Sequence, residues 1–181
     1  YRKELVKALN WFDANKELQK NGERMLTLPE FRTFLQYLRV STTQDSLAVY
    51  EDITKVRSPY RAEWIDADFK MKEKQLYVNY NHILSNGKLV PQNSDIIIPP
   101  TLMEDKRISL EDFLTKNFTP QGFPSKDVKP GDFYYYYPRS DDNSVARFDA
   151  NSDRANLSCY RNPSCTYDAL GVRAVKIGGK Q

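Results

Sequence analysis

Between Ala146 and Tyr160, apolar and polar residues alternate with a period of two on both sides of a short polar turn. Successive side chains of a β-strand point to opposite faces, so this pattern predicts two adjacent strands, each with one apolar and one polar face. Two ordinary amphipathic strands with solvated outer faces would alternate in the same way. The apolar positions are Ala146, Phe148, Ala150, Ala155, Leu157 and Cys159, and the polar positions, expected to face solvent, are Arg147, Asp149, Asn151, Asn156, Ser158 and Tyr160.

Helical periodicity is concentrated at the start of the chain. Apolar residues recur at helical spacing through the first forty residues, with Lys and Glu between them. Thr27 and Pro29 favour the start of a second helix, and Glu30 is placed to complete a capping box with Thr27. The apolar stripe of this predicted helix is Phe31, Phe34, Leu35 and Leu38.

From Tyr50 onward the pattern changes to that of short strands. Residues 60–65 and 75–80 alternate loosely, and Asn86-Gly87 favours a tight hairpin turn because both residues tolerate a positive φ. Residues 133–137 read as an aromatic strand. Half of these rings are expected in the core and half on the outer face of the sheet, where an aromatic platform for a sugar or a peptide is the alternative.

A short helix is expected over residues 110–118, opened by Ser109, and an ordered Pro- and Gly-rich loop follows over residues 119–131. Helices first and strands later favour an α+β fold with short antiparallel strands and long loops. The length of 181 residues fits one domain, so a single domain over residues 1–181 is predicted.

The net charge of +3 is too small to favour nucleic acid, which requires a dense basic stripe. No apolar run approaches the ~20 residues of a membrane helix. Residues Tyr1 to Glu4 have no signal-peptide character. We therefore expect no nucleic-acid partner and no membrane span, and the compartment stays open.

Cys159 and Cys165 are the two cysteines of the chain, and His82 is its single histidine. The cysteines either form one bridge or remain free thiols, and a zinc site would need more ligands. The polar and aromatic neighbours of His82 indicate a surface or packing histidine. No spacing of Ser, Asp and His suggests a catalytic triad, so no catalytic residue is predicted.

A cluster of acidic residues offers oxygen ligands of the kind that calcium prefers. The ligand spacing is not that of a regular calcium loop, so no cofactor is expected and a polar turn is the alternative to a calcium site. The residues concerned are Asp141, Asp142, Asn143, Asp149 and Asp153.

Residues 143–173 contain no Lys, Gln, Glu, Met or Trp. These five types make up roughly a quarter of the preceding chain, so about seven would be expected in a window of this length. All five are encoded by codons that end in a purine. A segment whose varied codons descend from asparagine codons ending in a pyrimidine cannot reach them; a chance bias in an Asn- and Ser-rich region is the alternative.

This segment resembles the variable region of a diversity-generating retroelement, in which an error-prone reverse transcriptase rewrites template adenines. The resemblance rests on motifs that would form the fixed frame, Ser144-Val145-Ala146, Ser152-Asp153-Arg154-Ala155, Arg161-Asn162-Pro163 and Leu170-Gly171-Val172-Arg173-Ala174-Val175. The candidate ligand-binding positions can all be reached by changing only adenines of an asparagine codon; they are Arg147, Asp149, Asn151, Asn156, Ser158, Tyr160, Cys165, Thr166, Tyr167, Asp168 and Ala169.

The ending over residues 170–175 is also similar to the formylglycine-generating-enzyme branch of the C-type-lectin-like fold, whose chains close on a Gly-aromatic-Arg strand. Residues 24–31 loosely match the Arg-Leu-Pro-Thr-x-x-Glu-Trp helix start of that branch. Val172 departs from the aromatic position, and neither Cys159 nor Cys165 stands where the oxidase places its cysteines. The resemblance therefore implies a C-type-lectin-like fold and not the catalysis.

What the resemblance implies is a receptor-type ligand-binding protein, not an enzyme, with a rigid scaffold and a variable binding segment over residues 143–173. Tyr160 and Tyr167 are the expected anchors of the binding surface. The expected ligand is another protein or a glycan on a cell surface, in a phage, virus or microbial surface setting. The oligomeric state stays open.

Two other classes of function remain at this point. An enzyme on the same fold, such as an oxidase, would place titratable groups together in a cleft. A structural or assembly protein would bury the outer face of the strands in an oligomer interface.

Overall fold

The computed structural model describes residues 8–139 and 143–177. Its helices are α1 (Trp11–Lys20), α2 (Leu28–Val40), α3 (Gln44–Thr54) and α4 (Leu110–Thr115), with a 3₁₀ turn, η1, at Pro99–Thr101. Its strands are β1 (Glu23–Met25), β2 (Arg61–Lys72), β3 (Gln75–Ser85), β4 (Lys88–Ile96), β5 (Lys106–Ile108), β6 (Phe133–Tyr136), β7 (Ser144–Ala150), β8 (Ala155–Arg161), β9 (Leu170–Val172) and β10 (Ala174–Lys176). The mixed α+β class predicted from the sequence is confirmed.

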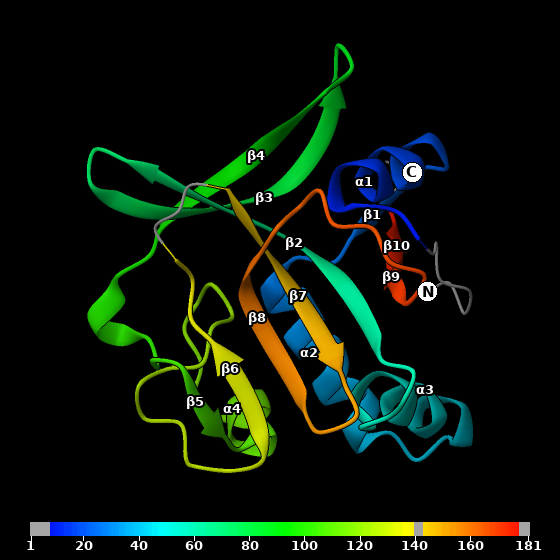
Figure 1. Cartoon of the computed structure of the whole chain (residues 1–181), viewed down its shortest axis with the longest axis vertical. Coiled ribbons are helices and arrows are strands. Elements are labelled where there is room, and N and C mark those ends of the chain that lie inside the picture. Colours follow the sequence, from blue (N-terminus) through cyan, green and yellow to red (C-terminus); the bar gives the residue numbers. More distant parts are fainter. Residues whose placement is uncertain (1–7, 140–142, 178–181) are drawn as a thin grey trace.

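Strand β2 is the centre of the main sheet, because it pairs with β3, β7 and β9. The strand order is β4-β3-β2-β7-β8-β6-β5, and β9 pairs with the beginning of β2. Most neighbours are antiparallel, whereas β6–β8 and β2–β9 are parallel. The β3–β4 hairpin extends beyond the body of the protein (Figure 1), and its Asn86-Gly87 turn has the expected positive φ at both residues.

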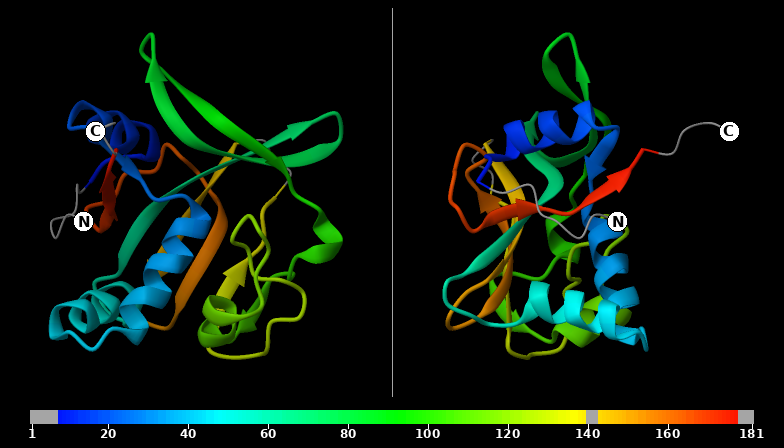
Figure 2. Two further views of the ribbon diagram at one scale, coloured as in Figure 1. Left: turned by 180° about the vertical axis from the view of Figure 1, so that it is seen from behind. Right: turned by 90° about the vertical axis from the view of Figure 1, so that its right-hand side faces the viewer.

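Helix α2 covers one face of the sheet (Figure 2) and begins as the sequence predicts. Glu30 reaches back to Thr27, whose backbone N–H donates to Glu30 Oε2 at 2.9 Å. Phe31 packs on Phe148 of β7 with ring centroids 5.5 Å apart, and Phe133 of β6 stacks on the same ring at 5.3 Å. This cluster, which also holds Leu157, is the main core.

A second apolar cluster lies where α1 and the C-terminal strands meet the start of β2. Trp11 and Trp64 are both buried in it, and the Trp11 indole N–H donates to the carbonyl of Ile65 at 2.9 Å. Strand β1 pairs antiparallel with β10, which brings the early and late parts of the chain side by side. The sequence predicts helical structure before the second helix, but residues 23–25 form a strand, because their backbone pairs with residues 174–176 from the far end of the chain.

Arg173 ties the C-terminal segment to the rest of the protein. Its Nε donates to Glu63 Oε1 at 2.6 Å, and its Nη2 donates to Asp52 Oδ2 at 2.9 Å. Asp52 also receives hydrogen bonds from Arg57 and Arg61. The residue pattern did not predict α3, the helix that supplies Asp52.

Within the described ranges, no helix has the length and apolar character to cross a membrane. Residues 1–7 lie outside the described residues. They include Tyr1 to Glu4 and the beginning of the region that the sequence predicts to be helical.

We predict that Leu157→Ala lowers the free energy of unfolding by about 2–5 kcal/mol, because Leu157 is fully buried against α2 and its truncation leaves a cavity. Denaturant unfolding measures the loss. Leu47→Ala, at an exposed position on α3, is the matched control and should cost well under about 1 kcal/mol. A loss below about 1 kcal/mol for Leu157→Ala would show that this side chain is not part of the core.

The Asp52 cluster should make stability depend on pH. Partial burial opposes ionisation of Asp52, but Arg61, Arg57 and Arg173 outweigh it and lower the pKa of this carboxyl. A depressed folded-state pKa stabilises the protein above the unfolded value of about 4, and this contribution is lost as the pH falls through the folded-state pKa. Wild type should therefore exceed Asp52→Asn in stability at pH 7, and the gap should close between about pH 4 and pH 2.

Urea unfolding at pH 7, 5, 4 and 3 measures this gap. Asp127→Asn, which changes an exposed loop carboxyl, is the control and should leave the stability close to that of wild type at each pH. A gap between wild type and Asp52→Asn that stays constant from pH 7 to pH 3 contradicts the assignment.

Candidate ligand-binding site

The antiparallel register of β7 and β8 brings the alternating polar residues together on one face. Arg147 pairs with Ser158, and Asp149 pairs with Asn156. Because Phe148 and Leu157 face α2, these four side chains point to the opposite face of the sheet. In Figure 1, β7 and β8 lie in front of α2, and no helix of the described chain lies in front of them.

The predicted solvent exposure of these residues is wrong. Asp149, Asn156 and Ser158 are at most 1% exposed, and Arg147 is 5% exposed. We call these four residues, together with Arg161, whose guanidinium contacts Asp149, the floor. The physical reason is that large side chains on neighbouring strands stand beside short ones and cover them, which local alternation cannot predict.

Three tyrosines form the rim of this site. Tyr134 and Tyr136 of β6 pair in register with Asn156 and Ser158, and Tyr160 follows Ser158 on the same face of β8. The rings of Tyr134 and Tyr136 are 4.4 Å apart, and Tyr136 meets Tyr160 edge-on at 5.4 Å. All three are half-buried, so the rim has exposed aromatic surface above a buried polar floor.

Arginines pack against the rim tyrosines. The Arg154 guanidinium lies over the ring of Tyr134 at 5.4 Å, and Arg139 lies over Tyr160 at 5.2 Å. Such exposed cation–π contacts contribute about 0.5–1 kcal/mol each. Both arginines also form ion pairs, Arg154 with Asp153 and Arg139 with Asp105, so the rim tyrosines are held by charged neighbours.

One carboxylate on the floor serves two guanidinium groups. Asp149 Oδ1 lies 2.8 Å from Arg147 Nη2, and Asp149 Oδ2 accepts a hydrogen bond from Arg161 Nη2 at 3.2 Å. The Arg147 guanidinium also lies 5.4 Å from the ring centroid of Trp64. The three charged groups together carry one excess positive charge.

Several buried polar atoms of the floor have no hydrogen-bond partner among the described residues. They are Asn156 Oδ1, Ser158 Oγ and the Nε atoms of Arg147 and Arg161. Leaving a buried donor or acceptor unsatisfied costs about 1–3 kcal/mol, so their concentration on one face calls for a partner from outside the chain. Water or a ligand with both donor and acceptor groups would satisfy them.

Tyr60 links the floor to the loop after β8. Its ring meets that of Tyr167 edge-on at 6.5 Å, and its hydroxyl feels the charges of Arg147, Asp149 and Arg161. Burial is the main cause that raises the pKa of Tyr60, and burial likewise raises the pKa of Tyr160. Both hydroxyls therefore remain protonated at neutral pH and can donate hydrogen bonds.

The other predicted site residues lie at different depths. Asn151 is at the far end of the β7–β8 hairpin, where its carbonyl accepts from the backbone N–H of Arg57 at 2.8 Å. Cys165 packs against the second apolar cluster. Thr166, Tyr167 and Asp168 are exposed, and Ala169 is half-buried. Of this loop, only Tyr167 has a described ring contact that connects it to the floor, through Tyr60.

Sequence reasoning identified the tyrosines of the rim but missed Tyr60. The alternation over residues 133–137 correctly placed half of the rings inward and half outward, since Phe133 and Tyr135 are buried and Tyr134 and Tyr136 are half-buried. Tyr60 carried no local signal, because only the pairing of β2 with β7 brings it near Asp149.

An open hollow of about 540 Å³ adjoins the rim. It is lined by Pro99, Pro100, Glu104, Asp105, Tyr137 and Arg139. Arg139 connects the two features, because it pairs with Asp105 in the hollow and lies over Tyr160 of the rim. A ligand larger than the floor has room to continue into this hollow.

The proposed calcium ligands are not assembled in the described chain. Asp141 and Asp142 lie outside the described residues. Asp149 faces two arginines, and Asp153 pairs with Arg154 at 2.5 Å. No group of three or more His, Cys, Asp or Glu side chains within the described ranges is arranged to hold a metal ion.

The two cysteines are free thiols in different environments. Cys159 lies in the main core, and burial raises the pKa of its thiol well above the usual range. Cys165 is half-buried in the loop after β8. Of the alternatives left open by the sequence, the structure selects two thiols.

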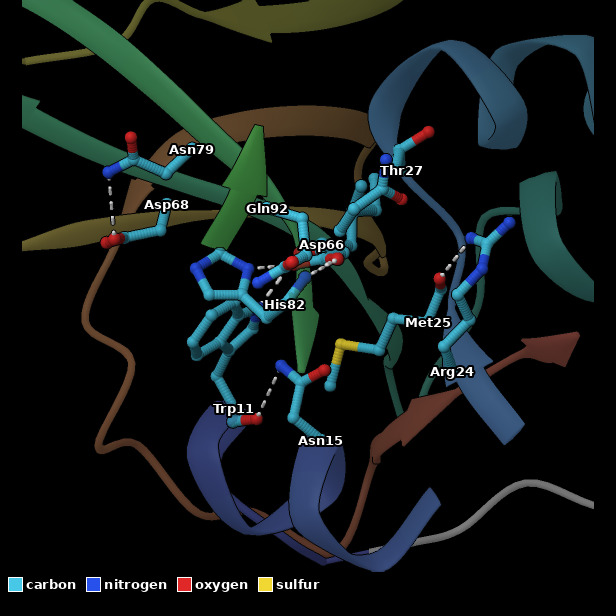
Figure 3. Close-up of polar contacts among 12 residues, drawn as sticks. Trp11, Asn15, Arg24, Met25, Thr27, Asp66, Asp68, Asn79, His82 and Gln92 are labelled. Carbon is cyan, nitrogen blue, oxygen red and sulfur yellow. Dashed lines mark hydrogen bonds and ion pairs between the residues drawn. The ribbon is translucent and has the colours of Figure 1, made fainter. Parts of the chain in front are cut away.

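His82 is a packing histidine (Figure 3), as its neighbours in the sequence indicated. Its Nδ1 lies 2.5 Å from Asp66 Oδ1, its backbone N–H donates to Asp66 Oδ2 at 3.1 Å, and Trp11 meets its ring edge-on at 5.0 Å. The side chains of His82 and Asp66 are 3% and 1% exposed. This cluster joins α1, β2 and β3 and lies apart from the floor.

Comparisons of the chain with protein-family models, with curated proteins and with solved structures give no match.

We predict that Ser158→Ala keeps or raises the free energy of unfolding, because it removes a buried hydroxyl that has no partner. Ser109→Ala is the matched control, since Ser109 Oγ accepts the N–H of Asp112 at 3.2 Å and caps α4. That variant should lose about 0.5–2 kcal/mol. A loss above about 1 kcal/mol for Ser158→Ala in urea unfolding would mean that its hydroxyl is satisfied in the native protein.

Proposed function

We propose that this chain is a receptor-type ligand-binding protein and not an enzyme, with its binding site on the outer face of β6, β7 and β8. The observation that carries the proposal is the set of buried, unpartnered polar atoms on the floor, below the tyrosine rim. Unpartnered buried atoms also occur elsewhere in the described chain, but the floor holds several of them together on one face, and each lowers stability. Sites where local structural rules are broken are the expected places of function.

The tyrosine rim supports a binding role. Tyr160 and Tyr167 are expected to be anchors, because tyrosine supplies large contact area with few rotatable bonds and a polar end. Tyr167 is 52% exposed, and the rings of Tyr134 and Tyr136 add further aromatic surface beside Tyr160. The ligand in this proposal is a protein or a glycan on a cell surface, and the setting is a phage, virus or microbial surface.

We further propose that a retroelement diversifies this site. The codon bias of residues 143–173 is the sequence support. The position of the candidate variable residues adds to it, because Arg147, Asp149, Asn156 and Ser158 come to one face while Phe148 and Leu157 hold the other face against α2. Changes at Asp149, Asn156 and Ser158 therefore leave the packing of Phe148 and Leu157 against α2 in place.

The finer fold assignment, a C-type-lectin-like domain, belongs to the same proposal. Three features favour it: the antiparallel pairing of β1 with β10, the capped start of α2 directly after β1, and the closing Gly171-Val172-Arg173 segment. Gly171 pairs with Glu63 of β2, and Arg173 binds the same Glu63 side chain. The closing motif thus has a structural role in fixing the end of the chain.

The genomic locus tests diversification. We expect a near-identical repeat of the sequence encoding residues 143–173 nearby, differing mainly at adenines, with a reverse-transcriptase gene beside it. Copies of the gene from related isolates should differ mainly at the positions proposed as variable, whereas Phe148, Leu157 and Arg173 should stay constant because they hold the scaffold. Sequencing the locus in several isolates gives the answer.

A complete genome without the repeat and the reverse transcriptase would contradict the proposal. So would substitutions that are spread evenly over core and floor positions. The codon bias would then be a chance property of this segment.

A further inference from the structure

We propose that the floor binds the carboxylate and hydroxyl groups of an acidic sugar; this inference rests on the proposed ligand-binding function and names its ligand class. Four features of the site support this ligand class: the charge of the floor, its unpartnered donors, its unpartnered acceptors and the aromatic rim.

The charge of the floor favours an anion. Among the described residues, Arg147 and Arg161 share the carboxylate of Asp149, so these three groups carry one excess positive charge. The arginines of the rim do not change this balance, because Arg154 pairs with Asp153 and Arg139 pairs with Asp105. The Arg147 side chain is buried and the Arg161 side chain is 30% exposed, so the excess charge is only partly solvated, and a ligand that carries one negative charge complements it.

The free donors of the floor fit a carboxylate. Arg147 and Arg161 each use Nη2 to contact Asp149, and the Nε of each is buried without a partner. The guanidinium group presents its N–H donors in a planar fork that matches the two oxygens of a carboxylate. A second carboxylate, from the ligand, would use donors that Asp149 leaves free.

The free acceptors of the floor require a ligand that also donates. Asn156 Oδ1 and Ser158 Oγ have no partner, and they lie on β8 directly opposite Asp149 and Arg147. A simple carboxylate has no donor to offer to Asn156 Oδ1. A sugar acid carries hydroxyl groups next to its carboxylate, so one molecule supplies both kinds of group.

The rim favours a ring over a flexible chain. Tyr134, Tyr136 and Tyr160 form a group of contacting rings beside the floor, on the β6 side of β8. A sugar ring has a rigid C–H face that packs on such surface, and its polar edge can at the same time reach the floor. An acidic peptide offers a carboxylate and backbone donors but must lose more conformational freedom on binding, so the geometry points to the sugar.

Isothermal titration of the full chain tests the proposal with five probes: N-acetylneuraminic acid, galacturonic acid, galactose, inorganic phosphate and acetyl-aspartate amide. We expect at least one of the two sugar acids to bind at least tenfold more tightly than each of the other three probes. Arg161→Gln should weaken its binding at least tenfold, and Ser158→Ala should weaken it several-fold.

Arg39→Gln is the matched control, because Arg39 pairs with Glu111 on the α2 side of the protein. This variant should bind the sugar acid with the same affinity as wild type. Thermal unfolding of each variant checks that it is folded. If Arg161→Gln does not fold, Ser158→Ala and the comparison of acidic with neutral sugar still decide the outcome.

Equal binding of galactose, phosphate or acetyl-aspartate amide would overturn the proposal, as would the absence of binding by both sugar acids. If such a result were found together with a retroelement at the locus, the acidic-sugar proposal would be wrong and the proposal of a diversified receptor would still hold. If a sugar acid bound and the locus had no retroelement, the proposed ligand class would hold and the proposed diversification would be wrong.

Discussion

The packing of Phe148 between Phe31 and Phe133 fixes the orientation of β7, and through β7 the nature of the whole outer face. When the apolar side chains of a strand pack against α2, its polar side chains must point to the opposite face of the sheet. A shift of the pairing register by one residue would exchange the two faces. Leu157 applies the same constraint to β8. The polar floor is therefore a consequence of apolar packing on the other side of the same two strands.

Several buried polar atoms of the floor have no hydrogen-bond partner among the described residues. Asp149 pairs with two arginines, but the Nε atoms of both arginines and the acceptors of Asn156 and Ser158 have no partner among the described residues. In a region that only had to fold, replacing these groups by apolar side chains would be neutral or stabilising. Their presence under a tyrosine rim is easier to understand if they complete their hydrogen bonds with a molecule that binds there.

The scaffold and the floor are held by different interactions, which is what a variable receptor would require. Arg173 binds Glu63 and Asp52 and so ties the end of the chain to β2 and α3. Strand β10 adds the pairing with β1. None of these contacts uses a floor side chain, so the floor can change without releasing the end of the chain.

Local sequence signals determined the elements whose cause is local. The capping box of Thr27 and Glu30, the Asn86-Gly87 turn and the two faces of β7 and β8 follow from backbone preferences and from the side-chain period of a strand. The codon bias of residues 143–173 also belongs to the sequence alone. The tertiary structure decided the rest: β1 became a strand because β10 pairs with it, and the patch expected to be exposed became a buried floor because larger side chains of neighbouring strands, such as Tyr134 and Tyr136, lie beside it. Burial depends on neighbours that come from distant parts of the chain, and the alternation of residues in one strand contains no information about them.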